Sequence, residues 1–170
     1  RINDPLYTDL TSADQSEEFR SRTIDLFKEF VERKSKEDTI SIFDSLLFQN
    51  INGWAFLCRM HLNESTDFAF RLIEILMKLD PVLIYIAQTD VEQNWRRTCR
   101  IRGAQWTKDK CGFSKDFDYV KAGIAWSANQ KYCLSIIDKS RLDALVIMNS
   151  DYDFDAHKSR IVHHLKLNTR

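Results

Sequence analysis

Hydrophobic and polar residues alternate along this chain with a period that predicts mostly helix. From Ser16 to about Lys36 the apolar residues recur every three or four positions with charged residues between them, which is typical of an amphipathic helix. Further helices are predicted over residues 46–60, from Asn63 or Ser65 to Leu79, from about residue 90 to 102, over 117–137 and over 154–167.

Three short runs of aliphatic and β-branched residues lie between these helical stretches and predict strands. They cover residues 40–44, 82–87 and 142–148. The second run follows Pro81 and is continuously apolar, as in a strand that is covered on both faces. Long helical connections between strands favour parallel pairing. We therefore expect an α/β fold, a parallel sheet of at least three strands with helices on both faces.

The pattern predicts one domain over residues 1–170, and no internal repeat or low-complexity linker divides it. Residues 1–15 are polar and irregular, and residues 90–115 form a polar segment rich in arginine. Three strands make a narrow sheet for so much flanking helix. We therefore expect an incomplete sheet whose further strands lie upstream of Arg1.

Composition narrows the function only modestly. The 25 basic and 25 acidic residues cancel, so the net charge gives no reason to expect binding to nucleic acid or to a membrane. No apolar run approaches the roughly 20 residues that span a bilayer. The four cysteines are widely spaced and form no C-x-x-C pair, which favours reduced thiols in a cytoplasmic protein. The sequence leaves oligomer formation open.

The strand predicted at residues 82–87 is followed by a cluster of arginines. Four of them, with no lysine, fall within seven residues: Arg96, Arg97, Arg100 and Arg102. A guanidinium offers a forked pair of donors that matches phosphate oxygens, and open α/β sheets bind ligands beyond the carboxyl ends of their strands. The cluster therefore predicts a polyanion site. The alternative is a solvated helix face whose arginines pair with Asp90 and Glu92.

A carboxylate, Asp44, ends the strand predicted at residues 40–44. At the carboxyl edge of a sheet such a group could hold Mg²⁺ through water, or accept a proton from an attacking hydroxyl. Alternatively, Asp44 caps a helix that begins at Ser45, because Asp is a favoured residue at that position.

The remaining polar clusters give no prediction of a metal site. The alternating carboxylates after the third predicted strand lack the glycine and the closing glutamate of a calcium loop, so capping of the last helix explains them better: Asp151, Asp153 and Asp155. No histidine of the closing helix has a second ligand at a spacing of four residues.

Several segments together resemble the back two-thirds of a P-loop kinase of the nucleoside and nucleotide kinase group, which includes thymidylate kinase-like proteins. The resemblance covers about residues 16–167. It rests on Ile40-Ser41-Ile42-Phe43-Asp44-Ser45, on Phe48-Gln49, on Pro81-Val82-Leu83-Ile84-Tyr85-Ile86, and on the segment that ends Arg100-Ile101-Arg102-Gly103-Ala104-Gln105-Trp106.

This resemblance implies an ATP- and Mg²⁺-dependent phosphotransferase that acts on a nucleotide or nucleoside. Asp44 would be its base or metal-associated carboxylate, and Arg97 and Arg100 would be catalytic arginines of a lid that closes over the phosphates. Contacts to substrate or phosphate would come from Gln49, Arg96 and Arg102. The last strand and helix would lie by the base of the nucleotide.

The phosphate loop of such kinases, Gly-x-x-x-x-Gly-Lys-Ser/Thr, does not occur in these 170 residues. Backbone N–H groups and the lysine of that loop hold the β- and γ-phosphates. We therefore expect the chain by itself to bind ATP weakly or not at all, and kinase activity to require a longer parent protein. The alternative function is a non-catalytic interaction domain that retains the scaffold without the loop.

Overall fold

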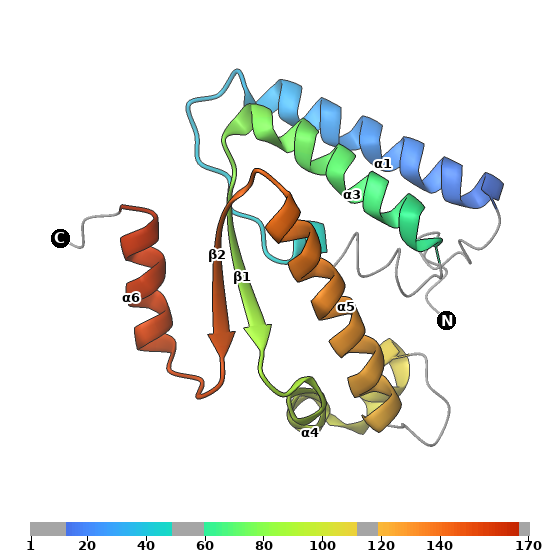
Figure 1. The fold of residues 1–170 in the computed structure, drawn as a ribbon, viewed down its shortest axis with the longest axis vertical. Coiled ribbons are helices and arrows are strands. Elements are labelled where there is room, and N and C mark those ends of the chain that lie inside the picture. The colour runs from blue at the N-terminus through green and yellow to red at the C-terminus, as the bar shows by residue number, and fades with distance from the viewer. Residues whose placement is uncertain (1–12, 49–59, 112–118, 167–170) are drawn as a thin grey trace. The chain divides into compact units, whose positions relative to one another are not determined.

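The structure of the chain is a computed structural model that describes residues 13–48, 60–111 and 119–166. Helices predominate (Figure 1). The α-helices are α1 (Ala13–Lys34), α3 (Leu62–Leu76), α4 (Val91–Cys111), α5 (Tyr119–Lys139) and α6 (Phe154–His164), with the 3₁₀ turn η3 (Met77–Leu79) after α3, and the strands are β1 (Val82–Gln88) and β2 (Asp143–Asn149). None of the described helices is long and apolar enough to cross a bilayer.

The chain forms two compact units. The first contains residues 1–82 and 133–143, and the second contains residues 83–132 and 144–170. The boundary passes through α5, so the first part of this helix belongs to the second unit and its last part to the first.

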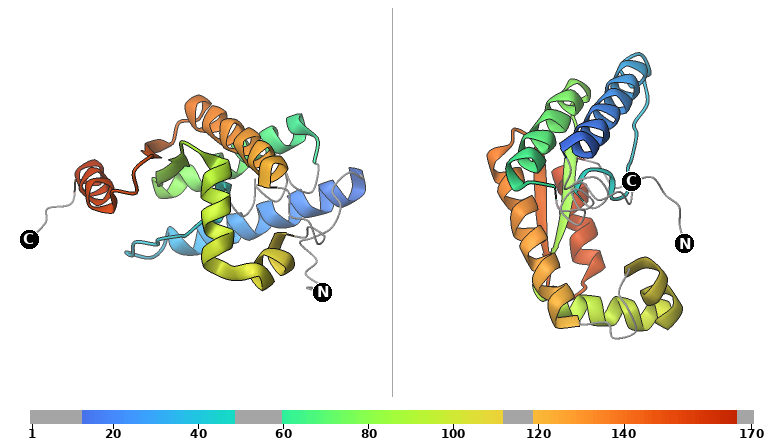
Figure 2. Two further views of the ribbon diagram at one scale, coloured as in Figure 1. Left: turned by 90° about the horizontal axis from the view of Figure 1, so that it is seen from below. Right: turned by 90° about the vertical axis from the view of Figure 1, so that its right-hand side faces the viewer.

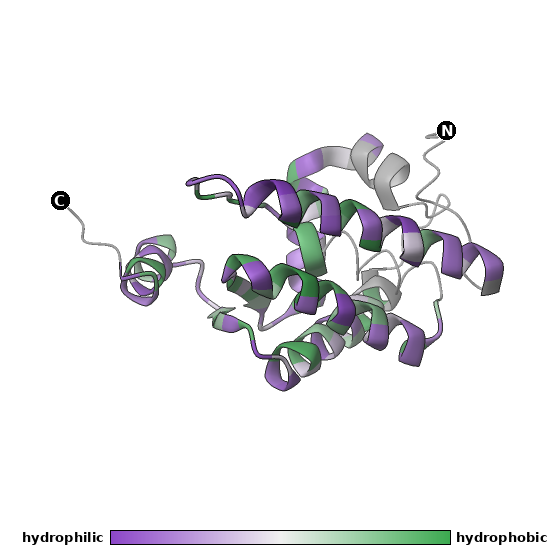
Figure 3. Ribbon diagram, turned by 90° about the horizontal axis from the view of Figure 1, so that it is seen from above, coloured by the Kyte–Doolittle hydropathy of each residue, from purple (hydrophilic) through white to green (hydrophobic). Residues whose placement is uncertain are grey.

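The first unit is built on α1 and α3, which pack side by side and run in the same direction (Figure 1). Near their N-terminal ends, the Ser16 hydroxyl donates a hydrogen bond of 3.0 Å to the Glu64 carboxylate. One turn further on, the rings of Phe19 and Phe68 meet edge to face, 5.8 Å apart. Hydrophobic and hydrophilic residues alternate in bands along both helices (Figure 3), as the helical period predicts.

The apolar bands of α1 and α3 supply most of the buried side chains of this unit. The buried residues are Ile24, Phe27 and Val31 of α1 with Phe68, Ala69, Leu72 and Ile73 of α3. The predicted start of α3 was wrong, since its N-cap is His61, which makes no side-chain cap bond, rather than Asn63 or Ser65. Most of the helix predicted over residues 46–60 lies outside the described residues.

The strand predicted at residues 40–44 is absent. Ile40 and Ile42 are each 91% exposed, and Phe43 contacts the Phe30 ring at 5.1 Å. The pattern was typical of a strand, but a strand also needs a neighbour that satisfies its backbone N–H and C=O groups. The sheet in the described part of the chain has two strands. The predicted fold, with at least three parallel strands, was therefore wrong.

The other two predicted strands exist, within one residue of their expected ends. β1 and β2 pair in parallel, as the arrows in Figure 1 show. Burial alternates at the carboxyl end of each strand. Ala87 and Ile147 have no exposed surface, whereas the adjacent residues Ile86 and Met148 are about half exposed.

Two glycines determine how the helices of the second unit lie. Gly103 has φ +85° and ψ 167°, which interrupts α4, and the helix changes direction there (Figure 2). Beyond residue 102, where the predicted helix ended, the chain is helical as far as Cys111. Gly123 lies within α5, where a Cβ atom would come 2.7 Å from the Cβ of Glu92. This glycine therefore allows α5 to approach α4 closely.

Candidate functional site

The carboxyl ends of β1 and β2 carry a group of side-chain amides. The backbone N–H of Gln88, at the end of β1, donates to Oε1 of Gln130 at 2.7 Å, and Nε2 of Gln130 donates to the Gln88 carbonyl at 2.9 Å. Nδ2 of Asn149, at the end of β2, donates to Oε1 of Gln88 at 3.4 Å. Three elements, β1, β2 and α5, are thereby joined at this edge.

One atom of this amide group is left without a partner. Asn149 is 6% exposed, and its Oδ1 accepts no hydrogen bond from the described residues. A buried carbonyl oxygen without a donor is costly. The carboxyl edge of the pair is thus polar and incompletely satisfied, as expected where an open sheet binds a ligand.

Helix α4 starts directly beyond β1. Oδ1 of Asp90 accepts a hydrogen bond of 2.9 Å from the backbone N–H of Gln93. This oxygen therefore caps the helix instead of pairing with an arginine. Glu92 does pair with Arg96, at 2.8 Å, and both side chains are substantially exposed. This pair is of the kind that a solvated helix face would show, and such exposed pairs contribute little stability.

Arg97 is held differently. Its Cζ lies 4.0 Å from the centroid of the Tyr152 ring, which is a close cation–π contact. The Tyr152 hydroxyl in turn donates to Oδ1 of Asn94, one turn earlier on α4, at 3.3 Å. Tyr152 has φ +58°, a left-handed conformation that is rare for a bulky side chain. The loop after β2 is thus attached to α4 through Arg97 and Asn94.

The other two arginines of the cluster, Arg100 and Arg102, are exposed. Trp95 of the same helix packs against Trp126 of α5, with ring centroids 5.6 Å apart and ring planes 34° from parallel.

The structure leaves the predicted meeting of Asp44 with the arginines untested. Asp44 belongs to the first unit and the arginines to the second. Asp44 is exposed, and its Oδ1 accepts a hydrogen bond of 2.8 Å from the hydroxyl of Ser45. Without a strand at residues 40–44, it is not held at the edge of a sheet. Gln49 lies outside the described residues.

One of the three carboxylates after β2 caps α6, as the sequence predicted. Asp153 is the N-cap of α6 and accepts a hydrogen bond of 2.9 Å from the backbone N–H of Ala156. His157 is buried, and its Nε2 lies 4.0 Å from Oδ1 of Asp151. Within residues 13–48, 60–111 and 119–166, no group of three or more His, Cys, Asp or Glu side chains could hold a metal ion.

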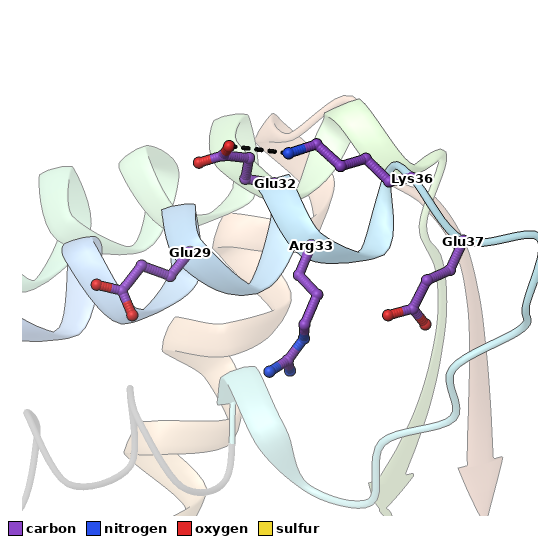
Figure 4. A pocket seen from close by; sticks show the side chains of 5 residues that line it. All are labelled: Glu29, Glu32, Arg33, Lys36 and Glu37. Atoms are coloured by element: carbon purple, nitrogen blue, oxygen red, sulfur yellow. Dashed lines mark hydrogen bonds and ion pairs between the residues drawn. The ribbon is translucent and has the colours of Figure 1, made fainter.

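A separate hollow of about 460 Å³ lies along the C-terminal half of α1 (Figure 4). It is lined by Glu29, Glu32, Arg33, Lys36 and Glu37. Lys36 pairs with Glu32 at 3.1 Å, and Lys34 hydrogen-bonds to Glu37 and lowers the pKa of that carboxyl. Because Glu32, Lys36 and Glu37 are already engaged by neighbouring charges, the hollow is a solvated helix face and not a candidate site.

The chain matches no protein-family model, no curated protein and no solved structure. The residues at the carboxyl edge of β1 and β2 are therefore the features of the molecule that indicate a function. Sequence reasoning identified the arginines there but missed Tyr152, Gln88, Gln130 and Asn149. Of these, Gln88 and Asn149 carried a usable signal, because each is the polar residue that ends an apolar run.

Proposed function

We propose that this chain is the substrate-and-lid portion of an ATP-dependent phosphotransferase whose acceptor is a nucleotide or nucleoside. The main support is the contact between Arg97 and Tyr152, which joins an arginine of α4 to the loop that follows β2. A cationic helix thereby lies at the carboxyl edge of a parallel strand pair, where phosphate ligands of α/β proteins bind.

Under this proposal the four arginines of the cluster contact different parts of the phosphate groups. Arg97 and Arg100 stabilise charge on the transferring phosphoryl group, since a guanidinium can donate two parallel hydrogen bonds to phosphate oxygens. Arg96 and Arg102 contact other phosphate oxygens, and Arg96 would exchange its exposed pairing with Glu92 for such a contact. Gly103 supports the role of a lid, because its conformation lets the following segment turn away from the helix.

The residues of this chain fit only part of an ATP site. The arginines suit phosphate, and the polar ends of β1 and β2 suit a planar base with hydrogen-bonding edges. A bound Mg²⁺ would neutralise phosphate charge, with Asp44 and Gln49 as the proposed substrate-side residues. The glycine loop and its lysine are not among the 170 residues, so tight binding requires a longer parent protein.

A cytoplasmic location is part of the proposal. Among the described residues, Cys99 and Cys133 are buried and form no disulfide, which suits a reducing compartment.

The second candidate function, a non-catalytic interaction domain, is favoured by one observation. Ile40 and Ile42 are the most exposed large apolar side chains among the described residues. Exposed isoleucines that follow one another in an extended segment are typical of a surface that another chain covers.

Titration of fluorescently labelled ATP against the 170-residue chain, with and without Mg²⁺, tests whether ATP binding needs a phosphate loop that these residues lack. We expect weak binding or none, because arginines without the glycine loop cannot position the phosphates. Micromolar, Mg²⁺-dependent affinity would contradict the idea that the phosphate loop must come from elsewhere.

A further inference from the structure

We propose that Tyr152 is a positioning residue that holds the guanidinium of Arg97 ready for an anionic phosphate; the inference rests on the proposed function. Tyr152 itself need not touch the phosphate. Its ring fixes where the Arg97 guanidinium lies, and the hydrogen bond that the Tyr152 hydroxyl donates to Oδ1 of Asn94 fixes the ring.

The first argument is the backbone of Tyr152. A left-handed conformation is unfavourable for a tyrosine and persists where surrounding contacts impose it. Two such contacts are present, the Arg97 guanidinium over the ring at 4.0 Å and the hydrogen bond to Asn94 at 3.3 Å. The chain thus maintains an unfavourable backbone conformation at the residue that meets the central arginine of the cluster.

The second argument is the charge of Arg97. Arg96, its neighbour, is paired with the carboxylate of Glu92. Arg97 forms no ion pair with any carboxylate of the described residues, and its partner is an uncharged ring. A cation–π contact restrains a guanidinium without neutralising it, so its N–H groups stay available to an anion.

The conformational entropy of the Arg97 side chain also favours anion binding when the ring restrains it. An exposed arginine samples many rotamers, and an anion that binds it must restrict them. A guanidinium already held over a ring loses less freedom on binding. Removal of the ring should therefore weaken anion binding by about three- to tenfold, which corresponds to the cost of ordering one long side chain on binding.

The experiment uses the 170-residue chain with ¹⁵N-labelled arginine and tripolyphosphate as the probe. NMR would follow the Nε–Hε signals of Arg97 and Arg100 in wild type, Tyr152→Leu, Tyr152→Phe and Phe154→Leu. Leucine keeps a side chain at the left-handed residue but has no ring, whereas phenylalanine keeps the ring and removes the hydroxyl. Phe154, the exposed first residue of α6, has its ring 6.4 Å from that of Tyr152, so its substitution is the control for a change beside Tyr152 that leaves the Tyr152 ring in place.

We expect a ring-current shift of the Arg97 signal in wild type, Tyr152→Phe and Phe154→Leu, and its loss in Tyr152→Leu. Tripolyphosphate should shift Arg97 and Arg100, with three- to tenfold weaker affinity only in Tyr152→Leu. Unchanged affinity in that variant, with a normal wild-type response, would overturn the inference and leave the proposed function standing. No response of either arginine in wild type would also overturn the inference, whereas the proposed function is tested by phosphoryl transfer in the full-length protein, which would supply the phosphate loop.

Discussion

The side-chain amide of Gln130 satisfies both backbone groups of Gln88, at 2.7 and 2.9 Å. A helix side chain thereby makes at the end of β1 the two hydrogen bonds that a neighbouring strand would otherwise provide. Because Gln88 is also bonded to Asn149 of β2, this contact anchors the edge from which the arginine helix departs.

Substitution of Gln130 by leucine should therefore destabilise the second unit. The change leaves the N–H and C=O groups of Gln88 unpaired in a partly buried place, which we expect to cost about 1–3 kcal/mol of unfolding free energy. Urea denaturation measures this loss. Gln93→Leu, at an exposed glutamine of α4, is the matched control and should change stability by less than about 0.5 kcal/mol. Equal effects of the two substitutions would contradict the role of Gln130.

Gly123→Ala should also destabilise the protein, although alanine is the better helix former. An alanine normally stabilises a helix interior by up to about 1 kcal/mol over glycine. Here its Cβ would lie 2.7 Å from the Cβ of Glu92 and 3.1 Å from its Cα, so α4 and α5 would have to separate. We expect a net loss of about 1–3 kcal/mol, as for other overpacked sites. A higher melting temperature in this variant would refute the close approach of the two helices.

Loss of the α6 cap should be measurable in a pair of neighbouring variants. Asp153→Ala removes the acceptor for the backbone N–H of Ala156 and should cost about 1 kcal/mol. For Asp155→Ala, within the first turn, we expect only the smaller loss of about 0.3–1 kcal/mol that comes from the helix dipole. Chemical denaturation of both variants checks the difference. A larger effect at Asp155 would mean that the cap is assigned to the wrong residue.

The fold was predictable where the signal was local. β1 and β2 were found within one residue, because each is a continuous apolar run that ends in a polar residue. Residues 40–44 carry a similar pattern and do not form a strand. A run of residues expresses its preference only when a neighbouring strand satisfies its backbone, and that condition depends on tertiary contacts.

The candidate site was predictable only in part, for the same reason. The arginines are neighbours in sequence and were found from their composition. Arg97 and Tyr152 are 55 residues apart, and no local sequence pattern predicts a contact between them. The residue type at position 152 also did not predict the left-handed backbone, because glycine or asparagine is the usual residue for that conformation.

We propose above all that the arginines of α4 serve phosphoryl transfer. Steady-state kinetics of the full-length gene product measures this directly, with ATP, Mg²⁺ and a panel of nucleosides and nucleotides as substrates. The variants are Arg100→Ala and Arg97→Ala, with Arg141→Ala as an exposed arginine outside the cluster. We predict turnover in wild type and in Arg141→Ala, and a loss of kcat of about a hundredfold or more in Arg100→Ala. Absence of phosphoryl transfer in wild type, or equal rates in Arg100→Ala and Arg141→Ala, would contradict the account.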